Sequence, residues 1–380
     1  MKLKILTACF LLACLASSCI KDEALNSEAA IDACTGSNIQ QATIDYDNFT
    51  IQIYISKGLD LSAININFQV PQGAVVTPDP SVAGDNVEYS LYNFKDNNPR
   101  KFKVTSEDKQ ISAVYTITVW QTEMPDNYHF ETLSSNNPFD VFYEQEDVVV
   151  GNEIIPRRLE WASGNPGFKL TVEAKTPQDY PTLQATGGVN GGKCLKLVTR
   201  STGSLGVMSK MYLAAGNMFI GSFDGGAAMS DAMKATHFGF PYFKIPTKLE
   251  GYYKYKAGDQ YSSGGKIVEG KIDNCDIYGV LYETTESLSF LDGSNSLSSP
   301  NIIALARTQN GFLPEADTWT PFSLDFITKS GKSIDKDKLN KGIYKLAIVF
   351  SSSVDGAKFS GAVGSTLYVD EVTLTSNKPQ

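Results

Sequence analysis

Hydrophobic and polar residues alternate along the first third of the chain. Apolar side chains recur at every second position within residues 49–55, 64–70, 102–104 and 115–119, with polar residues between them. This period of two is typical of strands with one buried and one solvated face. Turn-forming segments rich in Pro, Gly, Asn and Asp separate the runs. We expect an immunoglobulin-like β-sandwich over residues 35–121.

A longer β-rich region follows a short polar linker. Helical periodicity is almost absent from it, with one short helix expected near residues 225–235. We therefore expect an all-β chain whose second domain, residues 125–377, is a jelly-roll sandwich with insertions. The strand candidates are 193–199, 248–256, 276–284, 302–307, 319–327, 342–352 and 366–374.

The alternation also assigns a face to each side chain. In KLEGYYKYK (residues 248–256), Leu249, Tyr253 and Tyr255 form the better core set, which leaves the other face polar with one ring. If the neighbouring candidate strands adjoin, rings and polar groups share one sheet surface that could stack and hydrogen-bond a sugar. The candidate carbohydrate-binding residues are Tyr252, Lys254, Tyr278, Tyr282 and Trp319, with Trp161 in the WASGNPG loop as a further one. The alternative is that these rings only stabilise the sheet through cross-strand pairs, and that Trp161 is packed.

Composition excludes several classes of function. The formal net charge is −9, so binding to nucleic acid is not expected. The two histidines, His129 and His237, are too isolated for a zinc site or a histidine-based triad. Beyond the leader and Cys19, the three cysteines lack metal-ligand spacing and are expected to be buried free thiols.

The N-terminus has two lysines, an apolar run and small residues before Cys19, which is the pattern of a secretory signal over residues 1–18. It resembles a bacterial lipoprotein signal, which implies lipidation of Cys19, a tether over residues 19–34 and attachment to the outer membrane. The alternative is an ordinary signal cut nearby. The following IKDE resembles the export tag of surface lipoproteins, although by composition it is only a solvated tether.

Five segments of the second domain resemble one family, the putative carbohydrate metabolism domain of lipoproteins from glycan-degrading gut bacteria. They are WASGNPGF (161–168), GNMFIGSF (216–223), FGFPYFKIPTKLEGYYKYKAGD (238–259), DIYGVLYET (276–284) and GSTLYVDEVTL (364–374). The resemblance implies a jelly roll like that of carbohydrate-binding modules, often beside an Ig-like module. It implies no catalytic residues.

The segment LYVDEV is also similar to the last strand of many carbohydrate-binding jelly rolls, in which the Asp ligates a structural Ca²⁺. The resemblance makes Asp370 the candidate metal ligand and Glu131, near the first strand, its partner. The alternative is that Asp370 caps a turn and Glu131 is solvated.

The leading hypothesis is therefore a surface-anchored lipoprotein that binds a polysaccharide or glycoconjugate for a glycan-uptake system. A glycoside hydrolase on the same fold is the first alternative, and needs two carboxylates across a cleft. An adhesin or structural surface protein is the second. The acids available for hydrolysis are Glu160, Asp276, Glu283, Glu286 and Asp325, and the spacing selects no pair.

Overall fold

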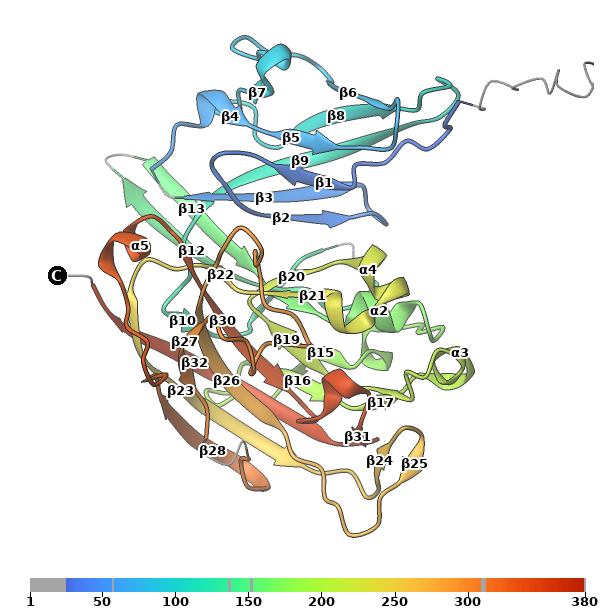
Figure 1. The fold of residues 1–380 in the computed structure, drawn as a ribbon, viewed down its shortest axis with the longest axis vertical. Coiled ribbons are helices and arrows are strands. Elements are labelled where there is room, and N and C mark those ends of the chain that lie inside the picture. Colours follow the sequence, from blue (N-terminus) through green and yellow to red (C-terminus); the bar gives the residue numbers. More distant parts are fainter. Residues whose placement is uncertain (1–24, 57, 136–137, 151–152, 309–311, 379–380) are drawn as a thin grey trace, which may run out of the picture.

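The computed structural model describes residues 25–378 apart from 57, 136–137, 151–152 and 309–311. The chain forms two β-rich domains, a smaller N-terminal one and a larger C-terminal one packed against it (Figure 1). The expected all-β fold class is confirmed. The predicted signal over residues 1–18 and the predicted lipid site at Cys19 lie outside the described residues.

The N-terminal domain is a β-sandwich. Its larger sheet has the order β2-β3-β9-β8-β6, and β1–β5 and β4–β7 form the facing pairs. All of these pairings are antiparallel except β3–β9, which is parallel. The elements are β1 (Ala33–Thr35), β2 (Ile39–Asp45), β3 (Thr50–Ser56), η1 (Leu61–Ala63), β4 (Ile64–Asn65), β5 (Asn67–Gln69), β6 (Val75–Pro78), η2 (Val87–Tyr89), β7 (Leu91–Tyr92), β8 (Arg100–Thr105) and β9 (Ser112–Thr122).

This domain starts earlier than the expected boundary at residue 35. Ile31 is fully buried in its core, Cys34 is buried beside it, and β1 pairs with β5. The expected tether over residues 19–34 is therefore wrong at its C-terminal end, because an apolar side chain within it completes the sandwich core.

The C-terminal domain contains two sheets stacked face to face. The first has the order β15-β16-β32-β23-β28, with β10 also paired to β32, and the second has the order β14-β19-β30-β26-β27-β29, with β22 also paired to β30. The strands of the first sheet are β10 (Asn127–Tyr128), β15 (Thr182–Thr186), β16 (Lys193–Val198), β23 (Ile245–Lys256), β28 (Ala316–Asp325) and β32 (Thr366–Asn377). Those of the second are β14 (Ala162–Ser163), β19 (Asn217–Phe219), β22 (Phe240–Pro241), β26 (Asp276–Glu283), β27 (Ile302–Ala306), β29 (Ile327–Thr328) and β30 (Tyr344–Ser351).

Shorter elements surround the two sheets. The hairpin β12–β13, which the alternation analysis missed, extends toward the N-terminal domain (Figure 1). The short helix expected near residues 225–235 is present as α4 followed by η4. These elements are β11 (Thr132–Leu133), β12 (Phe142–Val150), β13 (Glu153–Glu160), α2 (Asn165–Lys169), η3 (Pro177–Asp179), β17 (Arg200–Ser201), α3 (Gly203–Met208), β18 (Leu213–Ala214), β20 (Gly221–Phe223), α4 (Gly225–Ser230), η4 (Ala232–Lys234), β21 (Thr236–Phe238), β24 (Tyr261–Ser263), β25 (Lys266–Ile267), α5 (Lys336–Asn340), η5 (Gly356–Lys358) and β31 (Gly361–Ala362).

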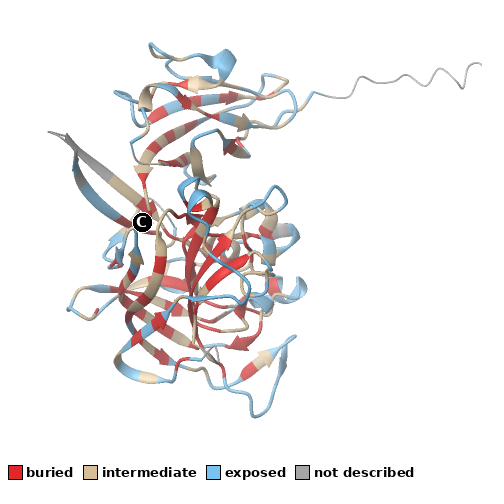
Figure 2. Ribbon diagram, turned by 60° about the vertical axis from the view of Figure 1, so that its left-hand side comes forward, coloured by how far each residue is buried: buried red, intermediate tan, exposed pale blue. Residues whose placement is uncertain are grey.

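The main core lies between the two sheets, where the buried residues in Figure 2 concentrate. Strand β23 contributes Leu249, Tyr253 and Tyr255, as its alternation predicted. Strand β26 differs, because its second face is also buried in a separate apolar cluster. This outer face is buried because loops cover it, and the alternation pattern does not reveal those loops.

The two domains make direct contact. Tyr54, which alternation placed on the solvated face of β3, is fully buried and joins the core cluster of the C-terminal domain. Its ring centroid lies 6.1 Å from that of Phe240. Gln41 donates a hydrogen bond to the carbonyl oxygen of Gly221 (2.8 Å), and Lys169 pairs with Asp47 (2.6 Å). Each of these contacts joins one domain to the other.

The cysteines and the helix lengths can also be compared with the sequence analysis. Cys34, Cys194 and Cys275 are buried free thiols, as expected. In the described part of the chain, no helix has the length and apolar character needed to cross a membrane.

A buried carboxylate fixes the start of the C-terminal domain. Glu144 on β12 accepts hydrogen bonds from the backbone N–H groups of His129 (3.1 Å) and Phe130 (3.0 Å). Phe130 has φ +57°, a left-handed conformation that costs free energy in a residue with a large side chain. Burial raises the pKa of Glu144 to about 7.

Replacing Glu144 with Gln should flatten the pH dependence of stability. Because the folded-state pKa lies above the ordinary value of 4.5, the folded state holds the proton more tightly, and stability falls as pH rises from about 4.5 to about 7. The lost stability is roughly 3 kcal/mol across that window. Urea unfolding at about pH 5 and about pH 7.5 measures it. Glu146→Gln, on an exposed position of the same strand, is the control and should keep the wild-type slope.

Candidate functional site

Three of the predicted sugar-binding residues share one surface. Tyr252 and Lys254 on β23 and Trp319 on β28 lie on the outer face of the first sheet. Lys254 Nζ lies 4.4 Å from the ring centroid of Trp319 and 4.7 Å from that of Tyr368. The Trp319 indole N–H donates to the carbonyl oxygen of Gly187 (3.1 Å). The lysine occupies the ring faces, so Tyr252, which is 38% exposed, is the ring most open to a ligand.

The other three predicted residues do not join this surface. Tyr278 and Tyr282 lie on β26 in the second sheet and are 5% and 0% exposed, so the single surface expected for all five residues is wrong. The Tyr282 hydroxyl donates to the carbonyl oxygen of Phe238 (2.5 Å). Trp161 is 4% exposed and packs against Tyr128 in the core, in agreement with the packed alternative.

The larger of two described pockets, about 860 Å³, opens over the outer face of the second sheet. Its floor comes from β19, β26 and β30, and loops and short helices form its walls. Tyr278 reaches it, and its hydroxyl bonds to Ser296 (3.2 Å). Apolar lining residues include Leu205, Met208, Phe219, Phe223, Phe238 and Phe359. We call this space the sheet cavity.

An ion pair supplies the polar anchor of the sheet cavity. The Arg307 guanidinium donates to both carboxylate oxygens of Asp276, at 2.9 and 2.7 Å. Burial raises the pKa of Asp276, while the Arg307 guanidinium opposes that shift. Arg307 uses Nε and Nη2 in this pair, and Nη1 has no hydrogen-bond partner among the described residues. The pair therefore presents a donor to a ligand in a largely apolar space.

The rim of the sheet cavity is exposed and apolar. Helix α3 contributes Leu205 and Met208, which are 58% and 80% exposed. Phe359, which also lines the cavity, has φ +53°, a conformation that costs free energy in a residue with a side chain. These side chains frame an opening that can bury the apolar face of a ligand.

The carboxylates of the sheet cavity are both engaged. Asp276 is held by Arg307, and Asp355 accepts from Tyr261 (2.7 Å) and Lys271 (2.9 Å). Although burial favours the protonated form, the hydrogen bonds from Lys271 and Tyr261 hold the pKa of Asp355 below its usual range. Each carboxyl group is held by a cation, whereas glycosidic cleavage needs an acid that is free to reach the substrate.

The other hydrolase candidates are scattered. Glu283 pairs with Lys338 (2.6 Å), and Asp325 lies on the first sheet 3.8 Å from Lys248. Glu286 is exposed in a loop, and Glu160 lines a different pocket. The structure therefore does not bring the five predicted acids together.

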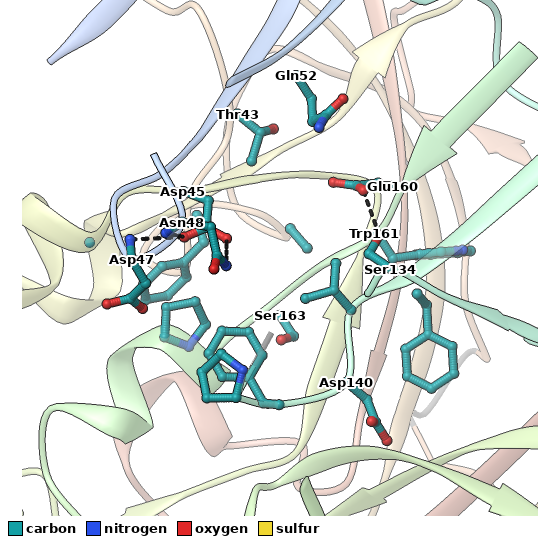
Figure 3. A pocket seen from close by; sticks show the side chains of 18 of the residues that line it. Thr43, Asp45, Asp47, Asn48, Gln52, Ser134, Asp140, Glu160, Trp161 and Ser163 are labelled. Carbon is teal, nitrogen blue, oxygen red and sulfur yellow. Dashed lines mark hydrogen bonds between the residues drawn. The ribbon is translucent and has the colours of Figure 1, made fainter. Parts of the chain in front are cut away.

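That second pocket, about 690 Å³, lies between the two domains (Figure 3). Its walls include Thr43, Asp45 and Gln52 from the N-terminal domain and Asp140 and Glu160 from the C-terminal domain. We call this space the interdomain pocket.

The predicted calcium ligands flank one loop. Asp370 accepts from the backbone N–H of Val189 (2.7 Å) and Glu131 from that of Lys193 (2.9 Å). Burial, together with the negative charges of Glu371 and Glu131, raises the pKa of Asp370. No group of three or more His, Cys, Asp or Glu side chains suited to a metal ion occurs in the described part of the chain. A cation here would need backbone carbonyl oxygens as well.

Sequence reasoning missed Arg307, Asp355 and the rim of the sheet cavity. Arg307 is the last residue of the candidate strand 302–307, but no periodicity marks it as the partner of Asp276. The cavity is assembled by loops from distant parts of the chain, and loop conformation leaves no alternating pattern.

The comparisons with known proteins agree with this architecture. The N-terminal domain matches the family described as "SGBP, N-terminal" over residues 31–119. The chain is similar to the crystal structure of a putative glycoside hydrolase from Bacteroides thetaiotaomicron, with 44% identity and a TM-score of 0.80, over 94% of this chain and 100% of that one. It is also similar to that of a putative glycoside hydrolase from Bacteroides vulgatus, with 41% identity and a TM-score of 0.60, over 68% of this chain and 100% of that one.

No curated protein matches the chain. The family described as "Putative carbohydrate metabolism domain" matches residues 129–375, which covers nearly all of the C-terminal sandwich and more than half of the chain. The resemblance inferred from the five sequence segments is confirmed, and both matched domains tie the chain to carbohydrates. The chain belongs to the family of the putative carbohydrate metabolism domain.

Proposed function

We propose that this protein binds a polysaccharide or glycoconjugate in the sheet cavity and captures it at the cell surface for uptake. The observation that carries the proposal is the pair between the buried Asp276 and Arg307, which lies in a cavity of about 860 Å³ whose lining combines aromatic and aliphatic side chains with Ser and Thr hydroxyls. Glycan binding sites combine a polar anchor of this kind with apolar surface that accepts the C–H face of a sugar ring.

Binding fits this cavity better than hydrolysis. A retaining or inverting glycosidase needs one carboxyl group protonated near neutral pH and a second one ionised. Asp276 and Asp355 are both held by cations. The alternative of a glycoside hydrolase rests on the names of the two similar Bacteroides structures, and release of reducing sugar tests it.

Arg307→Lys should weaken glycan binding about tenfold or more. Lysine preserves the positive charge beside Asp276 but loses the planar fork and its remaining donor. Loss of a hydrogen bond from a charged group costs roughly 1.5–3 kcal/mol. A glycan-array screen of the folded chain first identifies the ligand, and titration calorimetry then compares the variants. Ser298→Trp, which fills the cavity from an exposed position, should have the same effect.

Tyr252→Ala is the matched control on the outer face of the first sheet. It should leave binding unchanged if the sheet cavity is the site. Loss of binding in Tyr252→Ala with retention in Arg307→Lys would move the site to the Tyr252, Lys254 and Trp319 surface. Release of reducing sugar from the bound glycan, abolished by Asp276→Asn, would instead support the hydrolase.

The proposal includes a structural Ca²⁺ held by Glu131 and Asp370. The fit is partial, because each carboxylate already accepts a backbone N–H while Glu131 Oε2 has no partner among the described residues. Bound there, the cation would join the segment before β11 to β32. It would also offset the burial of Asp370 and its repulsion from Glu371 and Glu131, which together raise its pKa.

Calcium should raise the melting temperature by about 5 °C, and EDTA should reverse the rise. Asp370→Asn should remove the response, while Asp325→Asn, on an exposed position of β28, should keep it. Differential scanning calorimetry of the full chain makes the measurement. Equal melting temperatures with calcium and with EDTA would refute the proposed metal.

The proposed attachment is a lipid on Cys19, with the folded domains outside the outer membrane. Protease treatment of intact cells should then release fragments of the protein, and Cys19→Ala should release it in soluble form. Protection of the whole protein in intact cells would contradict surface display, even where the lipid is present.

A further inference from the structure

The interdomain pocket has the features of a second ligand site. Both domains line it, and Figure 3 shows Thr43 and Gln52 on one side with Ser134, Glu160 and Ser163 below them. We propose that the interdomain pocket binds a saccharide without acidic groups, at a site that exists only when the two domains are docked.

Contacts across the domain boundary hold the pocket open. Lys169 reaches from α2 to Asp47 (2.6 Å), and Gln41 reaches from β2 to the Gly221 carbonyl oxygen (2.8 Å). The Tyr54 hydroxyl accepts from the backbone N–H of Glu160 (3.4 Å) at the base of the same wall. A site that is formed before binding costs less ordering entropy when a ligand enters.

The interdomain pocket also contains polar atoms that are available to hydrogen-bond a ligand. Gln52 accepts from the Trp120 indole through Oε1 (2.5 Å), which leaves its amide N–H₂ without a partner among the described residues. Glu160 accepts from Ser134 through Oε1 (2.7 Å), and its Oε2 has no partner among the described residues. Asp140 accepts from the backbone N–H of Gln184 through Oδ2 (2.7 Å), and within the same described residues its Oδ1 has no partner. Hydroxyl groups, which both donate and accept, match this mixture of donors and acceptors.

Apolar surface complements these polar groups. The lining includes Ile44, Pro138, Phe139, Phe142, Pro166 and Phe223. The Phe139 ring packs against Tyr180, at 5.2 Å between centroids. Apolar side chains beside hydroxyl-binding atoms favour a sugar over a purely apolar ligand.

The charge of the pocket selects against acidic sugars. Four carboxylates line it, from Asp45, Asp47, Asp140 and Glu160, against the two cations Arg158 and Lys169. Both cations are already paired, Arg158 with Glu160 and Lys169 with Asp47. A sulfate or uronate group would meet uncompensated negative charge and no free cation among the described lining residues.

The inference rests on the proposed function only in taking the ligand to be a saccharide. The test therefore separates the two sites in the full chain. The probes are the neutral hexasaccharides cellohexaose, xylohexaose, mannohexaose and chitohexaose, with a heparin-derived hexasaccharide as the acidic comparison. Titration calorimetry measures affinity, and hydrogen exchange locates the site through protection of β2 and β14.

Thr43→Trp, which fills the pocket from the N-terminal domain, should weaken binding of the retained neutral probe about tenfold and remove this protection. Thr77→Trp places the same side chain on β6, at the opposite edge of the same sheet, and should change neither measurement. Arg307→Lys should leave the protection of β2 and β14 intact.

Unchanged protection and affinity in Thr43→Trp would overturn the inference while leaving the sheet cavity in place. Loss in Thr43→Trp with no effect of Arg307→Lys would support the inference and overturn the proposed function. Binding of the heparin-derived probe in preference to all neutral probes at the pocket, or no saturable protection by any neutral probe at millimolar concentration, would overturn the inference.

Discussion

The burial of β26 on both faces is the constraint on which the rest of the C-terminal domain depends. Ile277 and Leu281 face the main core, while Tyr278, Val280 and Tyr282 face a second apolar cluster on the other side. An apolar outer face must be covered, and the loops that supply Leu291 and Phe238 cover only part of it. The uncovered part is the floor of the sheet cavity. The cavity is therefore a consequence of an incomplete third layer.

Ion pairs determine which polar groups of the sheet cavity are available to a ligand. Asp276 and Arg307 compensate each other in a place where an unpaired charge would be strongly unfavourable. The pair holds the Asp276 carboxylate in two hydrogen bonds and leaves Nη1 of Arg307 without a partner among the described residues. Asp355 is held in a similar way, because it accepts hydrogen bonds from Lys271 and Tyr261. Both carboxylates of the sheet cavity are therefore paired with cations.

The N-terminal domain is more than a spacer. A module linked only by a flexible segment would leave Tyr54 exposed, but here that ring is in the core of its neighbour. Docking places the β2–β3 turn against α2 and creates the interdomain pocket, which neither domain possesses alone. The sheet cavity thus lies within one domain and the interdomain pocket lies at the junction of the two domains. The charged residues that line the two spaces differ.

The sequence by itself determined the all-β fold, the two sandwiches, the buried set of β23 and the family, because alternation and local motifs are local properties of the chain. It also placed Tyr252, Lys254 and Trp319 on one face and Glu131 beside Asp370. It misplaced Tyr278 and Tyr282, and did not find Arg307 as the partner of Asp276. Only the tertiary structure decided which sheet β26 joins, which loops cover it and how the domains dock. These depend on contacts between residues far apart in the chain, which no local pattern encodes.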